Sequence, residues 1–330
     1  MVELFQHTIR KPESKIYKYH KDIAAALQQK LEEVVLNLLI QTYQKYKVNN
    51  LCLAGGVALN SVMNAKILSN TPFKKIFIPP DPSDAGGAMG AALYLDRNPQ
   101  LIRPRKKTVG THLNIAKSFT PYLGPSYSSF QIKRALDKIG VKYKFYKDKQ
   151  KILDKVSNLL IKKQVIGWFQ GKMEWGPRAL GNRSILAAAT SKEMQNILNA
   201  KVKKREMFRP FAPVILKEYV DKYFKTDEPL PKIADYMLLV YPFTKNGKKD
   251  IPATVHINGT GRLQSIARID NPFYYDLIDT YRKKTGIPVI INTSFNIRGE
   301  PIVCTPEDAV KCFLGTDIDW LVIDNYIVSK

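Results

Sequence analysis

The sequence contains few of the residues on which several common protein classes depend. Among its 330 residues there are three cysteines, Cys52, Cys304 and Cys312, and none is paired in a CxxC spacing. This small and scattered set excludes a disulfide framework. The four histidines include no two at the spacing of metal ligands. The sequence alone therefore offers no cysteine- or histidine-based metal centre.

Long apolar runs are also absent. The longest run, residues 34–40, contains Asn37 and is far shorter than the ~20 residues that a membrane-spanning helix needs. The first fifteen residues, MVELFQHTIRKPESK, lack the apolar core of a signal peptide. We therefore expect a cytoplasmic location and no membrane partner.

Acidic residues are scarce relative to basic ones. There are 29 Asp and Glu against 52 Lys and Arg, a formal net charge of +23. Such a balance can serve nucleic-acid binding, because a basic surface attracts phosphate backbones without regard to sequence. The basic residues are nevertheless spread along the whole chain, and no aromatic-interleaved basic motif appears. A solvated, lysine-rich surface is the favoured interpretation, and nucleic-acid binding is kept as an alternative.

The length favours two domains, and the order of the elements is typical of an α/β protein. Helical periodicity extends from residue 20 to about 47, with one apolar stripe. The stripe contains Ile23, Leu27, Leu31, Val34, Leu38 and Thr42. Strands are predicted at 51–54 and 75–78, with a helix at 57–68 between them. The proline-rich residues 97–125 predict a linker, and a second unit begins near residue 127. In this unit Ser128 or Ser129 is predicted to cap a helix at 130–139, and Thr305 a helix at 306–314. A further helix is predicted at 194–202, and strands are predicted at 236–241 and at 320–323, where the fold ends.

The most informative stretch is GKMEWGPRALGNRS, residues 171–184, which follows the apolar run 165–169. The run predicts a buried strand because it is short, β-branched and aromatic. Glycine lets the backbone approach a ligand closely, and arginine binds phosphate or carboxylate oxygens with a planar fork. A tight surface turn with solvated charges is the alternative. Arg178 and Arg183 lie among small apolar residues, which favours an anion site.

Three later blocks have the same character: REMFRPFAP (205–213), TVHINGTGR (254–262) and VIINTSFNIRGEP (289–301). Each places arginine or asparagine next to glycine or proline, beside an apolar run. A buried arginine without a partner is costly and becomes tolerable when an anion completes it. Several such arginines in one domain predict a shared anionic ligand, such as a nucleotide or an acyl phosphate.

Two features of the first unit also suggest ligand binding. Gly55 and Gly56 follow a predicted strand and precede a helix that carries Asn60 in its first turn, an arrangement that suits an anion at the helix N-terminus. A structural turn explains the glycine pair equally well. Asp84 precedes an Ala- and Gly-rich predicted helix, either as its N-cap or as a carboxylate near a ligand.

Taken together, these blocks resemble the NodU/CmcH carbamoyltransferase family. The resemblance covers most of the chain from about residue 20 onward, in the family's order. The matching strings are LAGGVALNSVMNAKI (53–67), PPDPSDAGGAMGAAL (79–93), GWFQGKMEWGPRALGNRSIL (167–186), REMFRPFAPVIL (205–216), HINGTGRLQ (256–264) and INTSFNIRGEPIVCTPEDAVKCFL (291–314). Lys172 departs from the family pattern, which usually has arginine at this position. Lysine keeps the positive charge but lacks the planar fork of the guanidinium group.

The resemblance implies a fold and a division of the chain. Residues 1–98 would form an incomplete α/β lobe of the sugar kinase, heat-shock ATPase and actin (ASKHA) type. Residues 99–125 would be a linker, and residues 126–330 a YrdC-like α/β domain with a twisted mixed sheet. The first half of the ASKHA domain has no counterpart here, so the resemblance implies a separate chain as partner that supplies it. A remnant without transfer activity is the alternative.

The resemblance also implies a reaction. The YrdC-like domain would form carbamoyladenylate from carbamoyl phosphate and ATP, and the carbamoyl group would pass to a hydroxyl of a small-molecule acceptor. Arg178, Arg209, Arg262 and Asn292 match the family's catalytic positions that bind ATP and carbamoyl phosphate.

A second set of positions is implied for the transfer step. Gly56, Asn60 and Asp84 match the positions that bind carbamoyladenylate, and Asp84 also matches a ligand of a divalent metal, Fe or Mg. The metal would polarise the carbonyl group as a Lewis acid.

Overall fold

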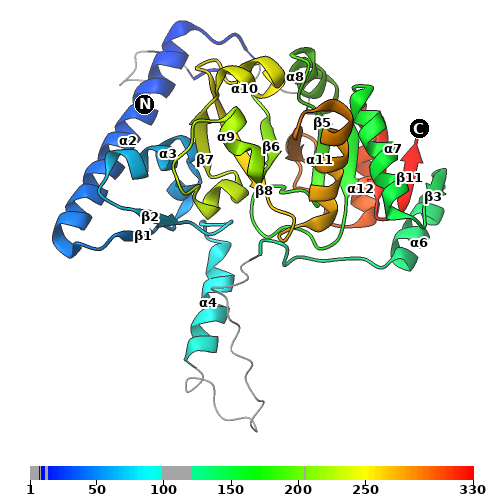
Figure 1. Ribbon diagram of the computed structural model, residues 1–330, viewed down its shortest axis with the longest axis horizontal. Helices are drawn as coiled ribbons and strands as arrows, with labels where there is room; N and C mark the ends of the chain where they lie inside the picture. Colours follow the sequence, from blue (N-terminus) through cyan, green and yellow to red (C-terminus); the bar gives the residue numbers. More distant parts are fainter. Residues whose placement is uncertain (1–6, 8, 12–13, 99–119, 204–205) are drawn as a thin grey trace.

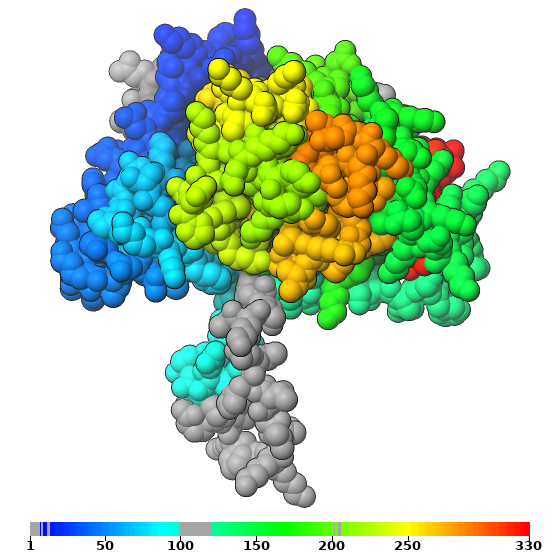
Figure 2. All heavy atoms as spheres, in the orientation of Figure 1, coloured from blue at the N-terminus to red at the C-terminus, as the bar shows by residue number. Residues whose placement is uncertain are grey.

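The computed structural model describes residues 7, 9–11, 14–98, 120–203 and 206–330 (Figures 1 and 2). In these residues the dominant feature is a nine-stranded mixed sheet with the order β3-β11-β10-β4-β5-β9-β6-β8-β7. The prediction of an α/β fold with a mixed sheet is confirmed. Most neighbouring strands are antiparallel, whereas β10 with β4 and β6 with β8 are parallel.

The strands of this sheet are short. Their bounds are β3 (Tyr143–Phe145), β4 (Ile166–Phe169), β5 (Arg183–Ala188), β6 (Ala212–Leu216), β7 (Leu239–Pro242), β8 (Thr260–Ile266), β9 (Val289–Ser294), β10 (Trp320–Ile323) and β11 (Tyr326–Ser329).

Helices cover both faces of the sheet. Helices α7 (Lys149–Ile161) and α11 (Pro272–Thr285) lie on one face, and α6 (Ser129–Ile139) and α12 (Pro306–Leu314) on the other. Every residue of β4 is buried as a result, with Trp168 packed toward α7 and α11 and Phe169 toward the opposite face. A strand covered on both sides reads as a continuous apolar run, which is the pattern seen at 165–169.

The N-terminal part contributes a smaller unit. It contains α2 (Lys18–Tyr46), β1 (Asn50–Cys52), α3 (Ser61–Asn70), β2 (Lys75–Phe77) and α4 (Gly86–Arg97). Strands β1 and β2 pair in parallel. Helix α3 packs against β7 at the edge of the large sheet, where the Asn64 side-chain amide donates to the carbonyl of Leu238 at 3.1 Å. Helix α4 projects away from the rest of the molecule (Figure 1).

Several predicted elements of the N-terminal unit are displaced. The chain after Gly55 first forms a 3₁₀ turn, Gly56–Leu59, and α3 begins only at Ser61. Asn60 is therefore the N-cap of α3, accepting the backbone N–H of Met63, instead of a residue of its first turn. The N-cap prediction for Asp84 is wrong, because α4 follows Ala85 and has no side-chain cap. Backbone turns over residues 83–87 lead into α4 in place of that cap.

The second unit also departs from the sequence-based assignment. Strands β5 and β11 were not predicted: β5 follows the glycine-rich loop and β11 comes after the strand that was expected to be last. The strand predicted at 236–241 begins instead with a 3₁₀ helix, Lys232–Tyr236. The helix predicted at 194–202 continues from α8 (Glu193–Ile197) into a π-helix, Leu198–Lys203.

Part of the predicted linker can be located. Residues 99–119 lie outside the described residues. Residues 120–125 lie against the glycine-rich loop, where the N–H of Trp175 donates to the carbonyl of Pro121 at 2.6 Å and that of Met173 to Pro125 at 2.9 Å. The division of the chain at 98 and 126 stays a prediction.

Candidate functional site

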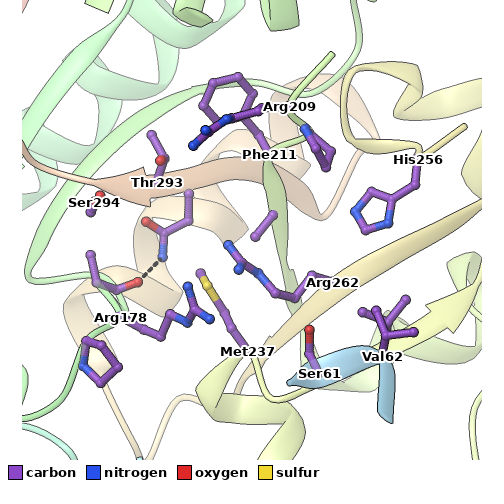
Figure 3. Close-up of a pocket in the computed structure, with 16 residues that line it drawn as sticks. Ser61, Val62, Arg178, Arg209, Phe211, Met237, His256, Arg262, Thr293 and Ser294 are labelled. Atoms are coloured by element: carbon purple, nitrogen blue, oxygen red, sulfur yellow. Dashed lines mark hydrogen bonds between the residues drawn. The ribbon is translucent and has the colours of Figure 1, made fainter. Parts of the chain in front are cut away.

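The four residues predicted to bind ATP and carbamoyl phosphate line one cavity. Arg178, Arg209, Arg262 and Asn292 come from four separate segments and surround a space of about 390 Å³ (Figure 3). Arg178 and Arg262 direct their guanidinium groups toward the same space. This volume lies within the range of small-molecule sites, roughly 300–1,000 Å³. The cavity is therefore the candidate functional site.

The strand order explains why these segments meet. Strand β6 lies between β9 and β8, and Ala212 at the start of β6 is opposite Asn292 of β9. Arg209 precedes β6 by a few residues, so it reaches the same end of the sheet. Arg262 lies on β8, the other neighbour of β6. The sheet thus brings together residues more than 80 positions apart.

Arg178 lies on the loop between β4 and β5, and a buried carboxylate fixes this loop. The Glu174 Oε1 atom accepts the backbone N–H groups of Leu180 at 2.7 Å, Asn182 at 2.7 Å and Arg183 at 3.3 Å. Burial raises the pKa of Glu174. The loop also passes through Gly181 at φ +116°, where a Cβ atom would lie 2.2 Å from the Tyr274 ring. Glycine is thus required for both backbone angle and space.

Two side chains of the large sheet, Asn292 of β9 and Gln264 of β8, also hold the loop between β4 and β5. The Asn292 Nδ2 group donates to the carbonyl of Ala179 at 3.1 Å, the bond drawn in Figure 3, and to the Gln264 Oε1 atom at 2.6 Å. Gln264 in turn donates to the carbonyl of Leu180 at 3.0 Å. Both N–H groups of Asn292 are therefore used within the protein, and its buried Oδ1 atom has no partner. Asn292 thus fastens the loop, and its Oδ1 atom is a buried acceptor without a partner.

The three arginines differ in their surroundings. Arg209 is the most open and forms an ion pair with Glu206 at 2.9 Å. Burial lowers the pKa of Arg178, whose Nε atom is buried without a hydrogen-bond partner. Among the residues that the structure describes, Arg178 forms no ion pair. A cation in this state is stabilised by an anion that enters the cavity.

Arg183 does not share this role, contrary to the expectation that paired it with Arg178. Its side chain is buried at the start of β5, with the guanidinium carbon 3.6 Å from the centre of the Phe169 ring. It donates to the carbonyls of Gln170 at 2.6 Å and Gly171 at 3.2 Å. Backbone carbonyls therefore bind both terminal nitrogens of Arg183, and its side chain does not line the cavity.

Sequence reasoning also overlooked residues of this site. Ser61 and Val62 at the start of α3 line the cavity, so the N-terminal unit forms part of its wall. Ser294 lines it too, two positions after Asn292, and the alternation of side chains along a strand was an available signal. The buried Lys203 ammonium group lies beside Ser294, 2.8 Å from the Asn296 Oδ1 atom. Its sequence context, KVKKRE, resembles a solvated basic run and gave no such signal.

His256 is a further cavity residue that was not predicted. It lines the wall beside Arg262, and its Nδ1 atom lies 3.1 Å from the Thr260 hydroxyl. Burial, with a further contribution from the Arg262 charge, lowers the pKa of His256 to about 4. The ring is therefore neutral at neutral pH and can act as a hydrogen-bonding group.

This pKa shift predicts a pH-dependent stability difference. In the unfolded chain the pKa of a histidine is about 6.5. Between pH 6.5 and pH 4 the unfolded state therefore binds a proton that folded His256 does not. The free energy of unfolding of wild type minus that of His256→Gln should be constant above pH 6.5 and decrease by about 3 kcal/mol as the pH falls to 4. Chemical denaturation at a series of pH values measures this. A difference that does not change with pH would contradict it.

Gly56, Asn60 and Asp84 do not line this cavity. Gly56 is exposed, and the Asn60 side chain is occupied by capping α3 and by a 2.8 Å hydrogen bond to Gln28. Asp84 is exposed, and within the described residues no group of three or more His, Cys, Asp or Glu side chains could hold a metal ion. The surroundings of Asp84 thus do not fit a metal centre, and its assignment as a ligand has no support. The carbamoyladenylate assignments stay predictions.

The described helices include none that could cross a membrane.

Comparison with known proteins identifies the family. The profile of the carbamoyltransferase C-terminus matches residues 157–330, and that of the carbamoyltransferase N-terminus matches residues 2–93. A partial structural similarity exists to full-length HypF in its phosphate- and nucleotide-bound form. It has a TM-score of 0.40 and 16% identity over 58% of this chain and 23% of HypF, too low to indicate a shared fold.

Curated relatives match almost the whole chain. Protein sll1178 of Synechocystis sp. is 41% identical over 99% of this chain and 55% of its own length. Nodulation protein NolNO of Sinorhizobium fredii is 37% identical over 94% of this chain and 44% of its own length. Nodulation protein NolO of Bradyrhizobium diazoefficiens is 36% identical, with coverages of 94% and 55%. This chain spans about half the length of these relatives, and it belongs to the carbamoyltransferase family.

Proposed function

We propose that the cavity binds ATP and carbamoyl phosphate and forms carbamoyladenylate. The carbamoyl group then passes to the hydroxyl oxygen of an acceptor, with release of AMP and of the hydroxyl proton. The observation that carries this proposal is the convergence of Arg178, Arg209, Arg262 and Asn292 on one cavity. Membership of the carbamoyltransferase family supports the choice of the transferred group.

The arginines suit the anionic parts of these substrates. Three guanidinium groups around one space place several donors and positive charges where phosphate oxygens would lie. A hydrogen bond to a charged group contributes about 1.5–3 kcal/mol, so three arginines can hold a triphosphate. The cost of burying Arg178 without an anion favours occupancy of the cavity by a phosphate ligand.

The chemistry requires alignment and neutralisation of charge more than a covalent nucleophile. Carbamoyl phosphate reacts with water to give carbamate and phosphate. A carbamate oxygen then attacks the α-phosphorus of ATP, a new P–O bond forms, and the bond to the β-phosphate breaks to release pyrophosphate. The arginines would stabilise the charge that develops on the phosphoryl oxygens and on the leaving group.

Asn292 suits the carbamoyl end of the substrate. Its N–H groups bind Ala179 and Gln264, which leaves the buried Oδ1 atom as an acceptor without a partner. A carbamate or carbamoyl NH₂ group is a donor that would satisfy it, whereas ionised acetate has neither an N–H nor an O–H donor. Neutral His256 provides a second hydrogen-bonding group that does not add charge to the cavity. Asn292 is thus proposed to distinguish carbamate from other small carboxylates.

Exchange of label between pyrophosphate and ATP tests the adenylation step directly. The full chain is incubated with ATP, radiolabelled pyrophosphate and carbamoyl phosphate. We expect label in ATP only when carbamoyl phosphate is present, since the exchange requires carbamoyladenylate as the intermediate. Acetyl phosphate is the matched control and should give no exchange. Folded protein without exchange would contradict the proposal and favour a remnant without activity.

A further inference from the structure

A larger groove adjoins the candidate cavity. It has a volume of about 1,060 Å³, and it shares Pro210 and His256 with the cavity, so the two spaces meet at these residues. The described residues that line the groove include two lysines, Lys192 and Lys248, and no acidic side chain. A space lined by charges of one sign attracts ligands of the opposite sign. The groove is therefore suited to an anionic ligand, as is the cavity beside it.

One loop contributes to both spaces. Arg209 lines the cavity, whereas the two residues before it, Met207 and Phe208, line the groove. The side chains of Met207 and Phe208 are 45% and 55% exposed. A ligand that binds Arg209 through phosphate oxygens and extends along this loop would place its uncharged part against an aromatic ring.

Two buried or partly buried amides hold this loop in place. The Asn199 amide donates to the carbonyl of Met207 at 3.2 Å and to that of Arg209 at 2.9 Å. The Gln195 amide donates to the same two carbonyls, at 3.4 and 3.2 Å. Phe208 lies between the two bound carbonyls, so its position at the surface is fixed. An apolar side chain held in this way beside a polar cavity is typical of a ligand contact.

A tight turn forms another part of the groove. The N–H of His256 donates to the carbonyl of Thr260 at 2.8 Å, and Gly259 adopts a φ of +77° between them. The Thr260 hydroxyl binds the Asn258 Oδ1 atom at 2.7 Å. This turn leaves the groove residue Ile257 96% exposed. Apolar side chains from two separate segments thus line the groove, which suits a flat, largely apolar ring.

We propose that the groove binds the nucleoside half of the nucleotide, with the base stacked on the Phe208 ring and the phosphates in the cavity among the arginines. The inference rests on the proposed function for the position of the phosphates. The cavity of about 390 Å³ has to hold both the triphosphate and carbamoyl phosphate, so the base and ribose require the adjoining space. Lysines beside exposed apolar side chains fit an aromatic base joined to an anion better than they fit an uncharged hydroxyl acceptor.

Binding of ATP and of inorganic triphosphate to the full chain separates the two halves of this site. Isothermal titration calorimetry measures both affinities at one Mg²⁺ concentration, without carbamoyl phosphate. Phe208→Ala should weaken ATP binding about tenfold, because stacking of a base on an aromatic side chain has an effect of this order. Its affinity for inorganic triphosphate should not change. Phe208→Trp keeps an aromatic ring and should retain the affinity for ATP. The matched control is Phe130→Ala, 75% exposed on α6, which should change neither affinity.

Three results would overturn the inference. The first is a wild type that binds ATP no more tightly than inorganic triphosphate. The second is Phe208→Ala that binds ATP as tightly as the wild type. The third is loss of affinity for both ligands in the same proportion, since this assigns Phe208 to the placement of Arg209. The melting temperature of each variant shows whether it stays folded.

The exchange assay distinguishes failure of this inference from failure of the proposed function. Exchange by Phe208→Ala with an unchanged dependence on ATP concentration would exclude the contact with the base and leave the reaction in place. Tighter binding of ATP than of inorganic triphosphate, without any exchange, would retain the groove and exclude the reaction.

Discussion

Replacing Arg178 by alanine is expected to reduce carbamoyl-phosphate-dependent ATP–pyrophosphate exchange by about 10²–10³-fold, the effect typical of removing one group that stabilises developing charge. Its guanidinium group faces the cavity, and within the described residues no acidic side chain pairs with it. Arg178→Ala removes a buried charge that the folded protein leaves without an ion pair, so the melting temperature should not fall. Initial rates of exchange at saturating ATP measure the effect.

Two further variants decide whether charge or geometry is responsible. Arg178→Lys keeps the positive charge and loses the planar fork, and we expect it to recover only part of the lost activity. Arg268→Ala is the control, because Arg268 is exposed and paired with Asp276 at 3.0 Å, away from the cavity. Exchange by Arg178→Ala at the wild-type rate would remove Arg178 from the proposed site.

Glu174→Ala is expected to cause the largest loss of stability among these variants. The side chain is buried, and its Oε1 atom accepts three backbone N–H groups of the loop. A buried donor without a partner costs about 1–3 kcal/mol, so the free energy of unfolding should fall by about 3 kcal/mol or more. Urea denaturation measures the loss. Because this loop carries Arg178, exchange activity should fall with it, even in the fraction that remains folded.

Glu174→Gln separates the hydrogen bonds from the charge. The amide oxygen can accept the same N–H groups, so we expect most of the lost stability to return at neutral pH. Burial raises the folded-state pKa of Glu174 above its unfolded value of about 4.3, so the folded state holds the proton more tightly. The contribution of Glu174 to the free energy of unfolding of the wild type is therefore complete at low pH. It is lost as the pH rises through the folded-state pKa. The stability of Glu174→Gln relative to wild type should therefore increase as the pH rises over that range. Free energies of unfolding that change with pH in the same way for both proteins would contradict the raised pKa.

Local features of the chain were predictable from the sequence where neighbouring residues decide them. The apolar run before the glycine-rich loop became β4, and Thr305 caps its helix as predicted. Of the two predicted candidates, Ser128 and Ser129, Ser128 is the N-cap of α6. Capping depends on a side chain and backbone groups a few residues away, and a strand buried on both faces requires a short apolar run. The four Arg- and Asn-bearing blocks were likewise visible, since each is a departure from an apolar pattern beside glycine or proline.

What each residue contacts was decided by the tertiary structure. Arg178 on the loop and Arg183 at the start of β5 have similar neighbours in sequence, yet one faces the cavity and the other is enclosed by backbone carbonyls. Asn292 could be predicted as a candidate site residue, but its use of both N–H groups to hold the loop follows from the pairing of β9 with β5 and β6. Strand pairing joins distant segments, and no pattern within one segment specifies its partner.

The sequence by itself determined the family blocks, the strand before the loop, the cap at Thr305 and the residue types of the candidate site, because these depend on contacts within a few residues. The tertiary structure alone decided the convergence of the arginines, the addition of His256 and Ser294 to the cavity, and the side of α2 that is covered. The stripe of α2 shows the reason: Leu27, Val34 and Leu38 of the predicted stripe are exposed, whereas Leu39 is buried. Periodicity identifies an apolar face, but what packs against that face depends on chain that lies elsewhere.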